Sequence, residues 1–262
     1  MPTDLIALLS PRNLILFIIV LTRLSGMITR APLISAYPIP VQIKAWFMAS
    51  FALILFPILS SQSGFQVPTS MPELILILLR EFMIGYITGF VANVVFVAME
   101  VAGDLISMQI GLTAAQAMNP MTGDQSPVFT QAYTVFASMI FISLNAYQWL
   151  FSAVYKTFEI LPPGYKFFVS GNLAHNVIFY SCEMFSIGFS IAIPLFAVMI
   201  IADFLLGFTA KMMPKMNIFM VALPVKIYLG FVLFLILLPQ MGAKIAILIE
   251  THLSSIIAVL GG

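Results

Sequence analysis

The chain of 262 residues is 61% hydrophobic and only 8% charged, and its mean hydropathy is +1.09. A soluble domain is about a quarter charged, so this chain belongs in a lipid bilayer or against protein that is embedded in one. Eleven basic and ten acidic residues give a net charge of +1. With no basic cluster to neutralise phosphates, the composition excludes a nucleic-acid-binding protein.

Short chemical motifs are missing from the sequence. The single cysteine, Cys182, excludes an intrachain disulfide. We find no zinc-binding spacing, phosphate-binding loop, dinucleotide fingerprint or nucleophile motif. We therefore expect no metal, no cofactor and no enzymatic activity. The N-terminus has Asp4 and Pro11 in place of the basic region of a signal peptide, so we expect the first hydrophobic segment to be retained.

The first two hydrophobic segments predict helices over residues 14–28 and 41–59. Arg23 lies within the first segment and Arg30 closes it. Three prolines between the segments exclude a continuous helix and predict an ordered turn. Pro57 is expected to end the second helix.

The third predicted helix, residues 73–107, is the longest. At 1.5 Å per residue it would span about 50 Å, more than a bilayer core. It must either protrude from the bilayer or break near one of its glycines. The stretch 109–124 that follows is rich in glycine, proline and small residues, contains no lysine or arginine, and keeps several apolar side chains. Irregular backbone at membrane depth is tolerated only where protein buries it or where it lines a cavity.

The second half of the chain predicts three further helices. They cover residues 128–155, residues 173–213 with a break at Pro194, and residues 217–238 with an end at Pro239. The tail 240–262 is amphipathic. Lysines and arginines do not alternate between successive loops as in a simple six-span bundle. We therefore expect an all-α integral membrane protein with long, partly broken helices and a non-standard topology.

The few charges inside the apolar segments are the candidate functional residues. They are Arg23, Arg30, Glu81, Glu100, Asp104, Asp203 and Lys226. A charge at the bilayer centre costs about 2.5–3.5 kcal/mol on insertion scales. Arg30 can extend its head to the interface. The others are explained either by ion pairs that hold helices together between subunits or by a proton relay. Because the acids are scattered along the chain, we favour the ion pairs.

Two glycines of the third segment, Gly85 and Gly89, are four residues apart. Small residues at this spacing let transmembrane helices approach closely. We interpret both as helix-packing positions.

Four separated motifs occur in one order: TRLSGMITRAPLISAYPIPVQIK, REFMIGYITGF, AGDLISMQIGLTAAQAMNPMTGDQSP and KMNIFMVALPVKIYLG. In this order and spacing they resemble the FliR/SctT family of type III export-gate proteins over essentially the whole chain. The positions that match the family motifs are Glu81, Gly85, Gly89, Gly111, Pro120, Asn217, Pro224 and Lys226.

A second similarity lies within the first. Residues 23–57 resemble a FliP-type segment and residues 194–241 resemble a FliQ-type hairpin. The resemblance therefore implies a FliP-like part, residues 1–185, fused to a FliQ-like part, residues 186–262.

The resemblance also implies a function. Members assemble with FliP and FliQ into a closed helical ring in the bacterial inner membrane at the flagellar basal body, FlhB binds that ring, and exported flagellar proteins pass through it. The loop after the third helix acts as a channel plug. Here it would comprise Ile110, Gly111, Leu112, Met118, Pro120 and Met121, without the phenylalanine that is common in the family. The alternatives are an injectisome subunit and a proton-coupled transporter.

Overall fold

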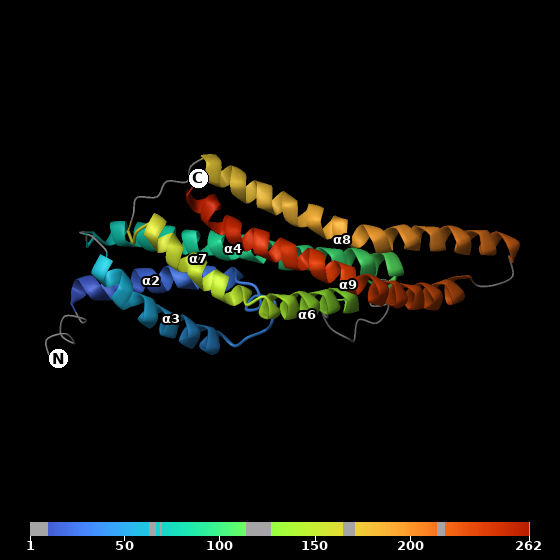
Figure 1. Cartoon of the computed structure of the whole chain (residues 1–262), viewed down its shortest axis with the longest axis horizontal. Coiled ribbons are helices and arrows are strands. Elements are labelled where there is room, and N and C mark those ends of the chain that lie inside the picture. The colour runs from blue at the N-terminus through green and yellow to red at the C-terminus, as the bar shows by residue number, and fades with distance from the viewer. Residues whose placement is uncertain are drawn as a thin grey trace. The chain divides into compact units, whose positions relative to one another are not determined.

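The computed structural model describes residues 10–62, 67–68, 70–113, 127–164, 171–213 and 218–261. The long regular elements of this part of the chain are all α-helices (Figure 1). They are α2 (Pro11–Arg30), α3 (Val41–Gln62), α4 (Met71–Ile110), α6 (Val128–Ser143), α7 (Ala146–Ile160), α8 (Gly171–Met212) and α9 (Ile218–Gly261). Five of them are long and apolar enough to cross a membrane, and α6 with α7 forms a sixth, bent candidate. The expected all-α integral membrane protein is confirmed.

The start of α2 is set by local chemistry. The side chain of Ser10 accepts a hydrogen bond from the backbone N–H of Asn13 at 3.4 Å, and Pro11 occupies the first helical position, where its missing N–H costs nothing. The helix ends at Arg30, and Leu33 in the following turn has a φ of 66°. The predicted turn is thus confirmed, and it returns the chain so that α3 contacts α2 (Figure 1).

The prolines interrupt fewer helices than expected. Helix α3 continues through Pro57 to Gln62, α8 continues through Pro194, and α9 continues through Pro239 into the amphipathic tail. The predicted ends at Pro57 and Pro239 and the predicted break at Pro194 are therefore wrong. In apolar helices, neighbouring helices and hydroxyl side chains can satisfy the backbone groups that a proline frees.

Helix α4 is continuous over 40 residues, or about 60 Å, so it does not break at its glycines. The predicted helix 128–155, in contrast, is two helices that bend by 73° at Asn145. Asn145 has a φ of 52°. Asparagine tolerates this left-handed conformation because its short polar side chain can bond locally.

The described chain forms two compact units. Unit 1 comprises residues 1–94, 145–180 and 249–262, and unit 2 comprises residues 95–144 and 181–248. Helices α4, α8 and α9 each contribute to both. The division into a FliP-like and a FliQ-like part concerns resemblance to two families, and it stays a prediction.

Each unit has its own aromatic and aliphatic core. In unit 1, the rings of Phe17 and Phe56 pack edge to face with their centroids 6.0 Å apart. They lie beside buried aliphatic side chains from α2 and α4. In unit 2, Phe129 and Tyr133 of α6 pack against Phe234 of α9. The hydroxyl of Tyr133 donates to the Met241 sulfur at 3.3 Å.

Candidate functional site

Arg23 is the centre of a buried polar cluster in unit 1, with only 1% of its surface exposed. Its Nε donates to Glu81 Oε2 at 2.6 Å. Its Nη2 donates to the carbonyl oxygen of Leu161 at 2.9 Å, and its Nη1 donates to the Thr157 hydroxyl at 3.3 Å. One side chain of α2 therefore binds α4, α7 and the residue that follows α7.

The remaining contacts of this cluster involve the Phe158 ring and the second carboxylate oxygen of Glu81. The guanidinium carbon of Arg23 lies 4.0 Å from the centroid of the Phe158 ring. Glu81 Oε1 accepts the backbone N–H of Gly164 at 3.0 Å. Both charges are thus neutralised and hydrogen-bonded, as buried ions must be. We call Arg23, Glu81, Thr157, Leu161 and Gly164 the clasp. Its ion pair joins helices of one chain, whereas the sequence interpretation placed such pairs between subunits.

Glycines bring α2 and α4 into backbone contact beside the clasp. A Cβ on Gly85 would collide with the carbonyl oxygen of Arg23, and a Cβ on Gly89 would collide with that of Met27. In the other direction, a Cβ on Gly26 of α2 would collide with the carbonyl oxygen of Phe82. Gly85 and Gly89 therefore lie where two helix backbones touch, and Gly26 completes the crossing from the opposite helix.

Arg30 also belongs to unit 1 but differs from Arg23 in being exposed. Its Nε donates to the Tyr86 hydroxyl at 2.7 Å, and its guanidinium lies 5.3 Å from the centroid of the same ring. This geometry lets the guanidinium reach a membrane interface, which is compatible with the expectation that Arg30 extends its head there.

Asp203 is the polar centre of unit 2. Its Oδ1 lies 2.6 Å from Lys226 Nζ, and its Oδ2 accepts a hydrogen bond from Gln109 Nε2 at 3.1 Å. The pair connects α8 with α9, and Gln109 adds the end of α4. In contrast to the clasp, 43% of the Asp203 side chain is exposed.

Glu100 and Asp104, one turn apart on α4, have different surroundings. The Thr130 hydroxyl donates to Asp104 Oδ1 at 2.6 Å. Gly103 allows this contact because a Cβ there would collide with the Thr130 backbone. Glu100 is partly buried. Asp104 therefore does meet a polar group, supplied by the start of α6.

The structure assigns the predicted charges to separate groups. Glu81 belongs to the clasp, Asp104 binds Thr130, and Asp203 binds Lys226 and Gln109. Across the described residues, no hydrogen bond or ion pair in these groups links one acid to another. The described part also contains no cluster of three histidine, cysteine or acidic side chains that could hold a metal ion.

The predicted plug begins at the end of α4. Ile110 is the last residue of α4 and is fully buried, with its Cδ1 against Gly230 of α9. Gly111 has a φ of 91°, which only glycine adopts readily, and Leu112 is partly buried. The remaining predicted positions, Met118, Pro120 and Met121, lie outside the described residues.

Several partners in these clusters carried no signal that sequence reasoning could use. Thr157 and Thr130 bind the charged groups through single hydroxyls, and threonine is common in apolar helices. Leu161 and Gly164 contribute backbone atoms, so their side chains reveal nothing. Gln109 offered more, since it is a long polar side chain at the end of an apolar segment.

Comparison with known proteins places the chain in a family. Residues 14–252 match the family described as bacterial export proteins, family 1. The chain is 27% identical over 222 residues to the flagellar biosynthetic protein FliR of Bacillus subtilis, covering 84% of this chain and 85% of that one. It is also 27% identical over 224 residues to FliR of Escherichia coli, covering 84% and 82%.

The Yop proteins translocation protein T of Yersinia pestis is 28% identical over 262 residues, covering 98% of this chain and 99% of that one. The resemblance expected from the four motifs is thus confirmed over nearly the whole chain. With its long apolar helices and its match over residues 14–252, the chain belongs to the bacterial export protein family 1.

Proposed function

We propose that the chain is a structural subunit of a flagellar type III protein export gate in the bacterial inner membrane, at the flagellar basal body. The observation that supports this most strongly is the match to FliR proteins of two distant bacteria over more than four fifths of each chain. Its function is to form part of the channel through which flagellar proteins leave the cytoplasm, without chemistry of its own.

The clasp suits a structural role of this kind. A channel wall must keep its shape while substrates pass, and a fully paired buried arginine with backbone-to-backbone helix contact fixes α2 against α4. The subunit would assemble with FliP and FliQ, and FlhB would bind the assembled ring. We further expect the chain to be degraded or to aggregate when it is produced without these partners.

The experiment that tests this function is complementation. A strain that lacks the gene should lose motility and secretion of hook and filament proteins, and the full chain should restore both. Tagged chain extracted in mild detergent should bring FliP, FliQ and FlhB with it. Normal motility and secretion in the deletion strain, with none of these proteins recovered, would overturn the proposal.

A virulence injectisome is the second candidate, because the match to the Yersinia pestis protein covers nearly the full length of both chains. The same deletion strain separates the two: loss of effector secretion with normal swimming would assign the chain to an injectisome. A proton-coupled transporter is disfavoured, since Glu81, Asp104 and Asp203 have different partners along the described helices.

We propose that residues 109–124 seal the channel. Apolar side chains in a narrow pore exclude water, and Gly111 provides a turn at the end of α4. Deleting Thr113–Thr122 should leave assembly intact and let small solutes leak through the inner membrane. An assembled deletion variant whose membrane is as tight as wild type would show that another element forms the seal.

A further inference from the structure

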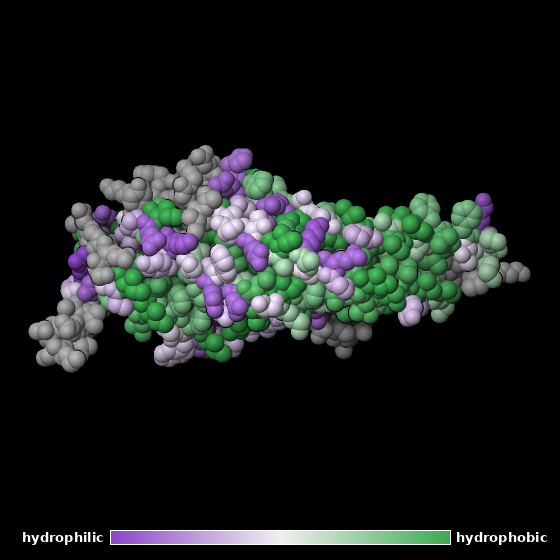
Figure 2. Space-filling view, in the orientation of Figure 1, coloured by the Kyte–Doolittle hydropathy of each residue, from purple (hydrophilic) through white to green (hydrophobic). Residues whose placement is uncertain are grey.

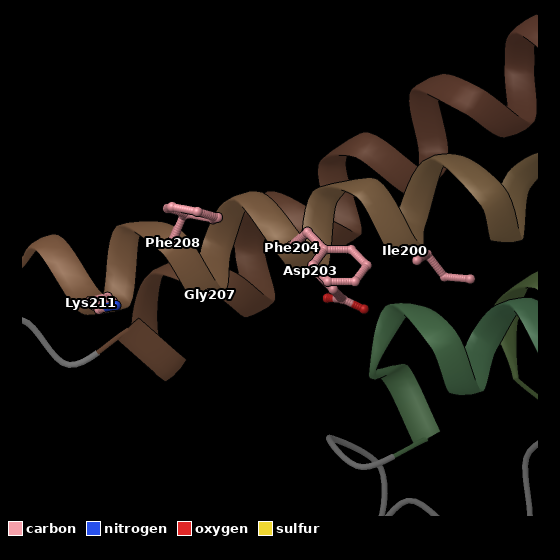
Figure 3. A pocket seen from close by; sticks show the side chains of 6 residues that line it. All are labelled: Ile200, Asp203, Phe204, Gly207, Phe208 and Lys211. Carbon is pink, nitrogen blue, oxygen red and sulfur yellow. The ribbon is translucent and has the colours of Figure 1, made fainter.

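Charged side chains are sparse on the largely hydrophobic surface of this chain, one face of which is shown in Figure 2. The basic side chains differ in whether an acid lies beside them. Arg23 pairs with Glu81. Lys211 lines a hollow on α8 together with Asp203 (Figure 3). Arg30, by contrast, is exposed and forms no ion pair with any residue that the structure describes.

The sequence around Arg30 also lacks negative charge. From residue 5 to residue 72 the chain has four basic residues and no aspartate or glutamate. The acid that neutralises Arg23 comes from α4, where Glu81 is buried in the clasp and is fully used by its bonds to Arg23 and Gly164. Arg30 therefore lies in a positively charged segment, and its counter-charge must come from outside that segment.

Tyr86 of α4 holds the Arg30 side chain in one position. Besides accepting a hydrogen bond from Nε, it places its ring 5.3 Å from the guanidinium carbon, within the range of a cation–π contact. The Tyr86 ring packs against Phe82 with centroids 6.2 Å apart. Its backbone nitrogen lies 2.9 Å from where a Cβ on Gly26 would be, one turn before Arg30. The helix crossing thus positions the guanidinium in advance, which lowers the cost of ordering it around a ligand.

The hydrogen-bond donors of this pair are mostly unused. A guanidinium has five N–H donors, and only Nε of Arg30 is bonded to a described residue. The two Nη groups keep four N–H donors. Because the Tyr86 oxygen accepts its bond from Arg30, its own O–H is left to donate. A planar fork of donors beside a hydroxyl, without an acceptor, suits an anion with several oxygens.

The position of Arg30 along α2 favours a membrane interface. Helix α2 is a candidate span that begins at Pro11 and ends at Arg30, and 20 residues cover about 30 Å, the thickness of a bilayer core. Lys44, in the first turn of the next span, borders the same connection. Tyr37 and Trp46 near this connection are 38% and 75% exposed. Tyrosine and tryptophan are enriched at the level of the lipid headgroups.

We propose that Arg30 and Tyr86 form a binding site for a phosphate group, supplied by an anionic phospholipid headgroup. The Nη groups of Arg30 donate to two phosphate oxygens, the Tyr86 hydroxyl donates to the same group, and Lys44 adds positive charge at the same interface. Inorganic phosphate shares this chemistry, but the end of a membrane span favours the lipid. The inference depends on the membrane helices and not on the export function.

Photolabelling with a lipid tests the site. The full chain, purified with the subunits that accompany it, is placed in nanodiscs that contain phosphatidylglycerol with a diazirine in its headgroup. The labelled peptides should include residues 30–44 or the turn of α4 around Tyr86. Unlabelled phosphatidylglycerol should compete with the label, whereas 10 mM inorganic phosphate, a probe concentration of about physiological order, should not. Competition by inorganic phosphate alone would overturn the assignment to a lipid.

Substitutions test which groups bind. Arg30→Gln should reduce labelling of these peptides at least about tenfold, because charge-assisted hydrogen bonds are the strong ones. Arg30→Lys keeps the charge without the fork, and Tyr86→Phe keeps the ring without the hydroxyl, so each should reduce labelling about threefold. Lys156→Gln is the matched control, since it removes the same charge from an exposed position of α7, and it should label as wild type.

Two results would contradict the site. Equal labelling of wild type and Arg30→Gln would show that Arg30 does not bind the headgroup. If Arg30→Gln in addition loses an accompanying subunit that Lys156→Gln retains, the anion at Arg30 is a carboxylate of a neighbouring protein and the lipid assignment is wrong. Labelling of Arg30→Lys at the wild-type level would show simple charge attraction and would overturn the proposed fork geometry.

Discussion

Two ion pairs of the described helices have the same length and opposite surroundings. Arg23 and Glu81 in unit 1 are 2.6 Å apart with side-chain exposures of 1% and 3%. Lys226 and Asp203 in unit 2 are also 2.6 Å apart, with exposures of 17% and 43%. The first pair is completed by buried groups of other helices, and the second is bonded to Gln109 and stays partly exposed. Burial, more than distance, therefore distinguishes the two pairs.

The largest expected effect is at the clasp. Arg23→Met leaves Glu81 buried without its counter-charge, and breaking a buried pair in this way costs about 3–5 kcal/mol. The variant should accumulate poorly and lose protease resistance in membranes. Arg23→Met with Glu81→Leu should recover part of the loss, because no charge then remains buried. Equal loss in the single and double variants would contradict this account of the clasp.

The glycine crossing beside the clasp should be nearly as sensitive. Gly85→Ala adds one methyl group, but that methyl meets the carbonyl oxygen of Arg23, and overpacking of this kind costs about 1–3 kcal/mol. Helix propensity alone predicts the opposite sign, since alanine favours a helix. Thermal stability of the extracted complex distinguishes the two, and a stabilised Gly85→Ala variant would exclude the close crossing.

Breaking the Lys226–Asp203 pair should affect assembly more than folding. Lys226→Met should cost no more than about 1 kcal/mol of unfolding free energy, because the pair is partly exposed. We expect reduced recovery of partner subunits from cells at a normal initial yield of the chain. If assembly is normal and export stops, Lys226 belongs to the transport path instead of the framework.

A comparably small effect on stability is expected at the junction of α4 and α6. Thr130→Val removes the hydroxyl that binds Asp104 and keeps the shape of the side chain, which should cost about 0.5–1.5 kcal/mol. Thr134→Val is the control, because the Thr134 hydroxyl donates to the carbonyl oxygen of Thr130 in its own helix. Urea or heat inactivation of the complex should rank Thr130→Val below Thr134→Val in stability. The reverse order would remove Thr130 as the partner that matters for Asp104.

The sequence predicted what depends on composition and spacing. Runs of apolar residues located the long helices, and the isolated charges Arg23 and Glu81 were recognised as costly. Their pairing could not be derived, because 58 residues separate them and nothing local brings two distant helices into register. Thr157 and the carbonyl of Leu161 could not be foreseen for the same reason.

The predicted helix ends were wrong at three prolines, where the helices continue, and at one asparagine, where a predicted helix divides. Pro57, Pro194 and Pro239 break helices in water, where the freed backbone groups are easily solvated, but here the helices continue through them. Asn145 gave little warning, yet its left-handed conformation divides the segment 128–155 into α6 and α7. Local propensity is a weak prior that tertiary packing overrides.

The most direct test compares one substitution in the two regions. Gly85→Leu and Gly207→Leu should be compared by pulse-labelling cells that make the complete complex, measuring protease-resistant chain and the share bound to other subunits. We predict that Gly85→Leu lowers the amount of protease-resistant chain, because its side chain meets the backbone of α2, whereas Gly207→Leu meets no described atom and leaves the newly made chain as resistant as wild type. Equal loss of resistance in the two variants would contradict the distinction between a glycine packed on a helix backbone and a glycine with no described neighbour within 4 Å.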